Sequence, residues 1–256
     1  MRLLRYKKGD SPARQGWILN NQVGPIEGSI FREFRRLEAE EDIQNITILP
    51  PILPSKIICI GRNYAAHASE HGVEVPEVPL IFLKPPTAVI GQGDTIILPP
   101  QSQQVEHEAE LTVVIGKRGR WIFPDEAENY ILGYTIANDV TARDLQRRDN
   151  QWTRAKGFDT FCPIGPWIET DFNPTDALIT CYVNDNVRQM ASTHDMVFNI
   201  PQLIAFISSV MTLEPGDLIL TGTPAGVSPL ADGDQVRISI EGIGSLENNV
   251  KAEPAH

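Results

Sequence analysis

The chain has 256 residues, a net charge of −11 and a sequence pI of about 4.9; 41% of the residues are hydrophobic and 21% are charged. This length and composition are typical of one globular domain, with or without a small appendage. An acidic chain without a basic cluster argues against nucleic acid or an anionic membrane as a partner, and it is compatible with binding of a divalent cation.

The cysteines and the apolar runs bear on the compartment. Cys59, Cys162 and Cys181 are scattered and form no CxxC pair, which argues against a disulfide framework or a structural zinc site. The start, MRLLRYKKGD, lacks the apolar stretch of a signal peptide, and no apolar run approaches the roughly 18 residues needed to cross a membrane. We therefore expect free thiols and a cytoplasmic protein.

The first part of the chain differs from the rest. It contains short strands and turns, and its charged stretch IFREFRRLEAEEDI is compatible with one short amphipathic helix. The segment PPILPSK follows, and its three prolines mark a connector. We predict a small N-terminal cap over residues 1–50 and a main domain over residues 51–256.

The main domain is rich in predicted strands. β-Branched runs bounded by Gly, Pro, Asn or Asp occur at 56–61, 80–85, 94–99, 110–117, 130–140, 177–185, 217–224 and 235–244. Helices are predicted only at 142–150 and at about 195–211. Because strands and helices do not alternate, and because GxGxxG and P-loop motifs are missing, we predict a strand-rich α+β fold on a mixed, rolled-up sheet rather than a nucleotide-binding doubly wound sheet.

The stretch VEHEAEL places acidic residues directly before an apolar run. Alternate residues of a strand face the same side, so Glu106, Glu108 and Glu110 would share one face, with His107 on the other. Such neighbouring carboxylates repel one another unless one is protonated or a hard divalent cation binds between them. A surface strand whose glutamates face water explains the pattern about as well.

A further carboxylate favours the metal site. Asp139 ends the apolar run YILGYTIAND, where an unpaired carboxylate would be costly to bury. Carboxylates without a convergent His/Cys set favour Mg²⁺ or Mn²⁺ over zinc. We therefore expect the glutamate cluster and Asp139 to share a divalent cation.

The stretch GRNYAAHASEH carries a histidine and a glutamate at helical spacing. His67 and Glu70 are i, i+3 neighbours if the stretch is helical, and a carboxylate bonded to one imidazole nitrogen raises the basicity of the other. Such a dyad could act on water or on a substrate C–H, but the pattern alone favours a chance pair on an exposed helix. The histidines that we predict to be structural are His71, His107 and His194.

Five blocks of this sequence together resemble one family. GRNYAAH, HEAEL, ANDVTARD, AKGFDTFCPIGP and ILTGTPAGV follow the order and spacing of the fumarylacetoacetate hydrolase family, over about residues 50–250. The chain resembles the shorter bacterial members, such as acylpyruvate hydrolases, oxaloacetate decarboxylases and 2-hydroxyhepta-2,4-diene-1,7-dioate isomerases. The resemblance implies a mixed β-roll, usually a homodimer, that binds Mg²⁺ or Mn²⁺.

The resemblance also implies a role for individual residues. The metal ligands it implies are Glu108, Glu110 and Asp139, and Glu106 lies outside the motif. The catalytic residues it implies are His67, Glu70 and Lys156, with the segment around His67 acting as a mobile lid. The substrate-binding residues it implies are Arg62, Asn63, Gln146 and Thr223.

Structural interpretations compete with some of these roles. Lys156 could be a plain surface residue in a glycine-flanked loop, Thr223 could belong only to a turn, and Arg62 could end a strand. We interpret Cys162 as a packing residue, because no histidine is placed in sequence to activate its thiol. The long N-terminal domain of the true fumarylacetoacetases is missing, so we do not expect fumarylacetoacetate to be the natural substrate.

The expected chemistry follows from the metal. A 2-oxo acid can chelate a divalent cation, which then stabilises the enolate. We expect an enzyme that cleaves a C–C bond in such acids, by acylpyruvate hydrolysis or oxaloacetate decarboxylation. The alternatives are a tautomerase of oxaloacetate or an isomerase of a 2-hydroxy-dienoate from aromatic catabolism, a non-catalytic protein that binds metal and oxo acid, and a purely structural protein.

Overall fold

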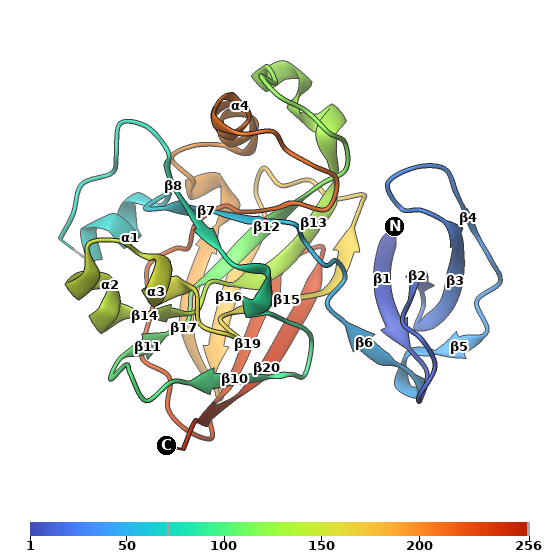
Figure 1. Ribbon diagram of the computed structural model, residues 1–256, viewed down its shortest axis with the longest axis horizontal. Helices are drawn as coiled ribbons and strands as arrows, with labels where there is room; N and C mark the ends of the chain where they lie inside the picture. Colours follow the sequence, from blue (N-terminus) through green and yellow to red (C-terminus); the bar gives the residue numbers. More distant parts are fainter. Residues whose placement is uncertain (71, 255–256) are drawn as a thin grey trace.

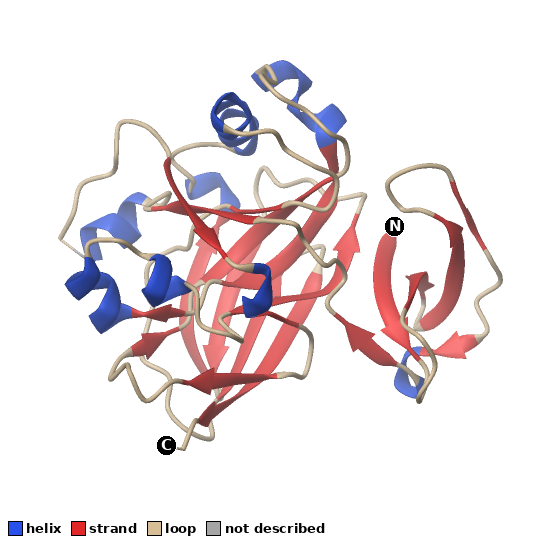
Figure 2. Cartoon of the chain, viewed as in Figure 1, coloured by secondary structure: helices blue, strands red, loops and turns tan. Residues whose placement is uncertain are grey.

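The computed structural model of the chain describes residues 1–70 and 72–254. Strands dominate the described part, and they form a 13-stranded mixed sheet, a five-stranded sheet and a two-stranded sheet. The helices lie around these sheets rather than between successive strands (Figure 2). This architecture confirms the predicted strand-rich α+β fold. Within the described residues, no helix is long and apolar enough to cross a membrane.

The elements follow the chain in this order. The first group of strands is β1 (Arg2–Lys7), β2 (Arg14–Leu19), β3 (Gln22–Gly28), β4 (Phe34–Arg36), β5 (Glu41–Asp42) and β6 (Thr47–Leu49). The next group is β7 (Ile57–Gly61), β8 (Leu80–Lys84), β9 (Val89–Ile90), β10 (Thr95–Leu98), β11 (Val105–Glu106), β12 (Ala109–Ile115), β13 (Ile131–Asn138) and β14 (Thr141–Ala142). The last group is β15 (Cys162–Glu169), β16 (Leu178–Val183), β17 (Asn186–Ser192), β18 (Leu218–Leu220), β19 (Gln235–Ile240) and β20 (Gly244–Ala252). The α-helices are α1 (Ala65–Glu70), α2 (Arg143–Asp149), α3 (Thr153–Lys156) and α4 (Ile200–Val210), and the 3₁₀ helices are η1 (Ile43–Asn45), η2 (Pro86–Ala88), η3 (Pro124–Tyr130) and η4 (Thr193–Asp195).

The N-terminal strands form a lobe beside the main body, drawn in blue in Figure 1. The helix predicted within residues 30–43 is wrong, because this stretch contains β4 and β5 instead, both paired with β3. Phe34 packs into a buried apolar cluster, so cross-strand pairing and burial override the helical propensity of the charged residues. The lobe is continuous with the large sheet, since β1 pairs with β15. The predicted division at residue 50 stays a prediction.

The core of the main body lies between the large sheet and the five-stranded sheet. The strand β12 lies between β13 and β18 in the large sheet and is buried along its whole length. Its Leu111 and Val113 belong to the same buried cluster as Ile238 and Ile240 of β19 in the other sheet. A strand covered on both faces needs a nearly continuous apolar sequence, and the run LTVVI meets this need. The glutamates directly before this run are therefore exceptional.

The helices near the site are short, and α1, α2 and α3 gather on one side of the molecule (Figure 1). The predicted helices are observed at α2 and α4, but α4 begins later than predicted. Its N-cap is Asn199, whose side chain accepts a hydrogen bond from the backbone N–H of Gln202 in a capping box. The preceding residues Thr193–Asp195 form the separate turn η4 instead.

Candidate metal and substrate site

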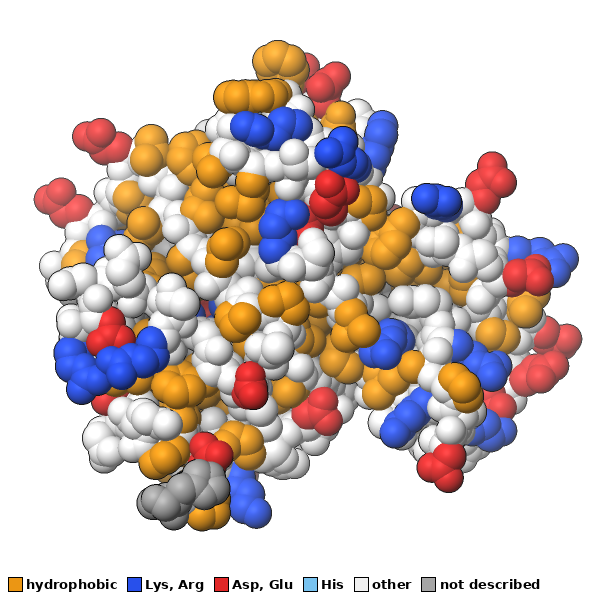
Figure 3. All heavy atoms as spheres, in the orientation of Figure 1, with side chains coloured by type: hydrophobic (Ala, Val, Ile, Leu, Met, Phe, Trp, Pro, Cys, Tyr) orange, Lys and Arg blue, Asp and Glu red, His pale blue; other side chains and the backbone are white. Residues whose placement is uncertain are grey.

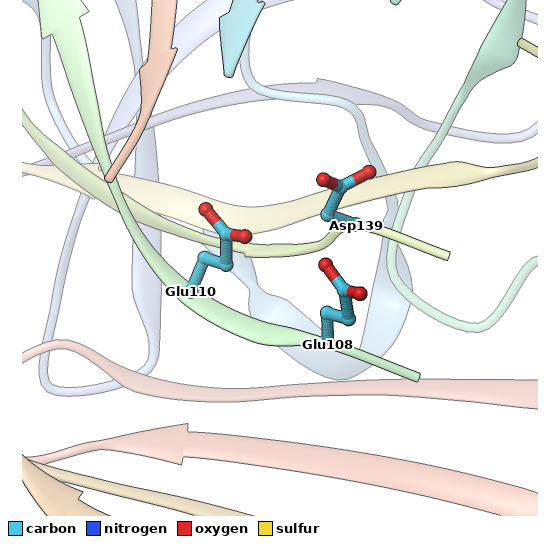
Figure 4. A group of neighbouring side chains, drawn as sticks. All are labelled: Glu108, Glu110 and Asp139. Atoms are coloured by element: carbon cyan, nitrogen blue, oxygen red, sulfur yellow. The ribbon is translucent and has the colours of Figure 1, made fainter. Parts of the chain in front are cut away.

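Three buried carboxylates meet at the ends of two paired strands. Ala109 of β12 lies opposite Asn138 of β13, so the residues flanking this pair come together, and the backbone N–H of Asp139 donates to the carbonyl oxygen of Glu108 at 2.9 Å. One carboxylate oxygen from each of Glu108, Glu110 and Asp139 lies within 4.8 Å of the other two. Figure 4 shows the three carboxylates grouped as neighbours. The structure thus brings together the three predicted metal ligands.

The predicted acidic strand is interrupted. The short strand β11 ends at Glu106 and pairs with β14, whereas β12 begins at Ala109. Glu106 does not join the three carboxylates and instead accepts a hydrogen bond from Nε of Arg143 at 2.8 Å. The exclusion of Glu106 from the metal ligands therefore agrees with the geometry.

Two buried lysines contact the carboxylates. Nζ of Lys156 lies 2.8 Å from Oε2 of Glu108 and 2.7 Å from Oδ2 of Asp139, and Nζ of Lys84 lies 2.6 Å from Oδ1 of Asp139. Lys156 is only 2% exposed, so it is not the surface residue that the sequence alone allowed. Lys84 is not among the residues predicted from the sequence, although a lysine at the end of the apolar run LIFLK was an available signal.

A buried arginine, also missed from the sequence, joins the cluster. Nη2 of Arg143 donates to Oε1 of Glu108 at 2.5 Å, and Nη1 donates to the side-chain oxygen of Gln146 at 2.7 Å. Arg143 therefore holds the outer side of Glu108 and orients Gln146, a predicted substrate-binding residue. Its only signal in the sequence was its place in the TARD block, four residues after Asp139.

The surrounding charges drive the two glutamate pKa values apart. Burial alone would raise the pKa of Glu108, but the positive charges of Lys156 and Arg143 hold it well below its ordinary value. Burial, together with the negative charges of Asp139 and Glu108, raises the pKa of Glu110 well above its ordinary value. Burial opposes the charge of Lys156, yet Asp139 and Glu108 raise the pKa of that lysine. Of the two glutamates, Glu110 is therefore the one whose surroundings favour the protonated form when no metal is bound.

The donor set fits Mg²⁺ or Mn²⁺. Three carboxylates supply the oxygen ligands that these hard cations prefer. Oε2 of Glu110 accepts from the backbone N–H of Gly222 at 2.7 Å, whereas Oε1 has no hydrogen bond within the described residues. Glu110 lines the cavity, so this second oxygen is available to bind a cation.

The predicted histidine–glutamate pair lies on α1. Nδ1 of His67 is 3.4 Å from Oε2 of Glu70, a long contact for a hydrogen bond. Glu70 also accepts from the backbone N–H of Gly226, at 3.1 and 3.2 Å. His67 is buried, so the exposed helix that the pattern favoured is wrong for this histidine. His71 lies outside the described residues.

A cavity of about 220 Å³ lies over the carboxylates. Its lining includes, of the predicted site residues, His67, Glu108, Glu110, Lys156, Arg62, Gln146 and Thr223. Arg62 has the left-handed φ of 58° and its guanidinium lies 6.0 Å from the ring centre of Trp152. Within the described residues, Arg62 pairs with no carboxylate, so its charge is available to a ligand.

Asn63 has a different environment from the other predicted substrate-binding residues. It is fully buried and does not line the cavity. Its side-chain amide donates to the carbonyl oxygens of Thr221 and Phe198, at 2.8 and 3.0 Å, and accepts from the N–H of Phe198 at 2.8 Å. The structure therefore gives Asn63 a structural role, in which it ties the residues after β7 to the end of β18.

The cysteines are free and buried, as predicted. Burial raises the pKa of Cys162 and of Cys181 to about 12. A thiol with such a pKa is almost entirely protonated near neutral pH, and the thiolate is the nucleophile. Cys162 is therefore a packing residue, as we expected.

Comparisons with known proteins agree with this geometry. The family described as "Fumarylacetoacetate (FAA) hydrolase C-terminal" matches residues 56–251. The chain is 46% identical to a Bos taurus protein named "Oxaloacetate tautomerase FAHD2A, mitochondrial", over 80% of this chain and 69% of the relative.

Two solved structures are similar over nearly the whole chain. One is a 5-carboxymethyl-2-hydroxymuconate delta-isomerase from Mycobacterium smegmatis, with 45% identity and a TM-score of 0.91, and the alignment covers 99% of this chain and 100% of the other. The second is a maleylpyruvate hydrolase from Sphingobium sp. SYK-6 in complex with manganese(II) and pyruvate, with 31% identity, a TM-score of 0.81 and the same coverage.

Proposed function

The chain belongs to the fumarylacetoacetate hydrolase family, and from this premise we propose that it is an Mg²⁺- or Mn²⁺-dependent enzyme acting on small 2-oxo dicarboxylic acids through an enolate. The observation that carries this proposal is the buried Glu108–Glu110–Asp139 cluster beneath a cavity that His67 and Lys156 also line. The maleylpyruvate hydrolase structure, which holds manganese and pyruvate, supports both the metal and the class of ligand.

The metal ligands of the proposal are Glu108, Glu110 and Asp139. A bound Mg²⁺ or Mn²⁺ would supply Lewis-acid stabilisation of the negative charge that develops on a 2-oxo acid. Lys156 adds a fixed positive charge beside the same position, and a preorganised charge in a buried site lowers the barrier without reorganisation.

His67 is the proposed proton carrier. In the keto-to-enol direction its imidazole removes a proton from C3 of the substrate and then donates that proton to the keto oxygen, so one C–H bond breaks, one O–H bond forms and the imidazole returns to its starting state. Glu70 lies 3.4 Å from Nδ1 of this imidazole, and a carboxylate in contact with one ring nitrogen raises the basicity of the other. Arg62 also lines the cavity, and within the described residues its guanidinium pairs with no carboxylate, so it is suited to bind the second carboxylate of a dicarboxylic acid.

We place keto–enol tautomerisation of an oxaloacetate-like acid first. The support is the tautomerase name of a relative at 46% identity, together with a site that needs only one proton carrier. Cleavage of a C–C bond, the reaction that the sequence favoured, is the second candidate. The maleylpyruvate hydrolase supports it, but at the lower identity of 31%. The cleavage reaction needs the same enolate and, for hydrolysis, a water molecule that His67 would activate.

The test is proton NMR of oxaloacetate mixed with the purified protein and either Mg²⁺ or Mn²⁺. The Mn²⁺ concentration is kept well below that of oxaloacetate, so that the paramagnetic ion broadens the signals only weakly. A sample with a chelator is the control. Faster exchange between keto and enol forms without extra pyruvate is the expected result. Faster release of pyruvate would move the assignment to cleavage. No acceleration of either process with either metal would overturn oxaloacetate as the substrate.

A matched pair of variants separates the site from the rest of the protein. Glu108→Gln keeps the shape of the side chain but removes a ligand charge, so it should lose both Mn²⁺ binding and turnover. Glu214→Gln breaks an exposed ion pair with Arg118 and should retain both. Full turnover of Glu108→Gln in the presence of a chelator would contradict the assigned ligands.

Two wider properties stay predictions. The resemblance implies a homodimer, and sedimentation of the purified protein would measure the number of chains. We propose a cytoplasmic enzyme with no nucleic-acid or membrane partner. Charged side chains of both signs are interspersed on the face in Figure 3, as expected for a protein without a nucleic-acid surface.

A further inference from the structure

The buried side-chain amide of Gln189 contacts a strand and a loop that form the site, although Gln189 does not line the cavity. Gln189 belongs to β17, at the edge of the five-stranded sheet, and is fully buried. Its Oε1 lies 3.0 Å from the backbone nitrogen of Ala109 and 3.0 Å from Nδ1 of His107. Its Nε2 lies 2.8 Å from Oγ1 of Thr223 and 2.7 Å from the carbonyl oxygen of Pro224. All four hydrogen-bonding positions of the amide are thus used.

The partners fix the direction of every bond. The N–H of Ala109 can only donate, and the carbonyl of Pro224 can only accept, so the two ends of the Gln189 amide cannot be exchanged. Nδ1 of His107 must therefore carry a proton. Because Thr223 accepts from Gln189, its own hydroxyl hydrogen is donated to the carbonyl oxygen of Ala109 at 3.0 Å. The hydroxyl of Thr223 thus cannot donate to a substrate carboxylate without breaking this bond.

The segments joined by Gln189 carry the candidate metal and catalytic residues. Ala109 lies between Glu108 and Glu110, so its two backbone bonds hold the stretch that presents both glutamates. In the loop after β18, the N–H of Gly222 donates to Glu110 and the N–H of Gly226 donates to Glu70. Direct bonds also join the loop to β12, since the N–H and the hydroxyl of Thr221 donate to the carbonyl oxygen of Leu111, at 3.1 and 2.8 Å.

Close packing supports the same connection. A Cβ atom on Gly226 would overlap the backbone carbonyl of Arg188, the residue before Gln189. The φ of Gly226 is 102°, a conformation that favours glycine. The loop therefore packs directly on β17, and its position depends on that strand.

We propose that Gln189 is a positioning residue that sets the spacing between the glutamate stretch of β12 and the loop 221–226, and thereby the metal affinity of the site. This inference rests on the metal site of the proposed function. Outer partners that orient metal ligands typically change affinity by about 10–100-fold when they are removed.

The test measures Mn²⁺ affinity by isothermal titration calorimetry without substrate. Gln189→Met, which keeps the length of the side chain but removes the amide, should bind Mn²⁺ at least about tenfold more weakly. The matched control is Asn248→Leu. Asn248 is another buried amide of the same sheet, on β20, and it donates to the carbonyls of Gly91 and Asp94. This control should lose stability but keep its Mn²⁺ affinity within about twofold, at a temperature where both variants are folded.

A second variant keeps the inference testable if Gln189→Met does not fold. Thr223→Val removes the hydroxyl that links Gln189 to Ala109, and it should also weaken Mn²⁺ binding without substrate, whereas a residue that only contacts substrate would leave that affinity unchanged. Unchanged affinity in the folded variants would overturn the role of Gln189. Failure of the wild-type protein to bind Mn²⁺ would instead overturn the proposed metal enzyme, so the two failures are distinguishable.

Discussion

Glu108 and Glu110 lie two residues apart, yet their surroundings favour opposite protonation states. Lys156 and Arg143 contact Glu108 and lower its pKa, whereas within the described residues Glu110 has only the N–H of Gly222 as a hydrogen-bond partner and lies beside Asp139. The negative charge of the cluster is therefore partly neutralised by Lys84, Lys156 and Arg143, and protonation is favoured at Glu110. Because carboxylate ligands bind a divalent cation in their ionised form, metal binding should become weaker as the pH falls.

His67 has a proposed role in proton transfer that is separate from metal binding. His67→Asn should lower turnover by about 10²–10⁴-fold, because general acid–base catalysis contributes that much, while Mn²⁺ affinity stays nearly unchanged. The measurements are steady-state turnover and calorimetric Mn²⁺ titration of the same preparation. His194→Asn, at an exposed position in η4, is the control and should match the wild type in both. A parallel loss of Mn²⁺ affinity would show that His67 also supports the metal.

At the scale of elements, the site depends on the turn that follows β18. Gly222 has a φ of 98°, and a Cβ atom there would lie 2.7 Å from Cβ of Asn63. The turn brings the N–H of Gly222 to Glu110. The side chain of Asn63 is held in place because its amide donates hydrogen bonds to the carbonyl oxygens of Thr221 and Phe198. The loop after β7 and the loop after β18 therefore hold each other in place beneath the cavity.

We predict that Gly222→Ala lowers Mn²⁺ affinity, because the added methyl group must move the N–H away from Glu110. The left-handed backbone alone should destabilise the protein by about 1–3 kcal/mol. Gly233→Ala is the matched control, since Gly233 has a φ of 87° but no atom within 4 Å of an added Cβ. Denaturant unfolding and Mn²⁺ titration of both variants separate the two effects. Equal Mn²⁺ affinity in the two variants would contradict the prediction.

At the scale of the whole molecule, the five-stranded sheet supports the back of the site in the large sheet. His107 lies at this junction, where its ring contacts Gln189 of β17 and Oγ of Ser228. It is buried, as expected of a structural histidine, and burial lowers its pKa from 6.5 to about 4. The folded protein therefore keeps His107 neutral at pH values where the unfolded chain protonates it.

This difference predicts how stability depends on pH. The contribution of His107 to the free energy of unfolding is complete above pH 6.5 and decreases as the pH falls toward 4, because the unfolded state binds the extra proton. The total change is about 3 kcal/mol, from about 1.4 kcal/mol per pKa unit. Urea unfolding with a chelator at several pH values measures it. The difference in free energy of unfolding between the wild type and His107→Gln should follow this pH dependence. Parallel pH profiles of the two proteins would contradict the prediction.

The sequence by itself determined the strand-rich fold, the family and the three carboxylates that the structure brings together. These features depend on local patterns: β-branched runs, glutamates two residues apart and an aspartate after an apolar strand. The motif blocks also identified His67, Lys156 and Gln146, which line the cavity as expected. By contrast, the stretch 30–43 has helical propensity but forms strands, because pairing with β3 decides its conformation.

Only the tertiary structure decided which groups surround the carboxylates. Lys84 and Asp139 are 55 residues apart in the chain, and Gln189 and Ala109 are 80 apart, so no local spacing relates them. The role of Asn63 could not be predicted from local spacing either. Its motif implied substrate binding, but its amide donates hydrogen bonds to the carbonyl oxygens of Thr221 and Phe198. Residue types and periodicity are written in the sequence, whereas the partners of a buried polar group depend on strand pairing between distant segments, and those partners set its charge and its role.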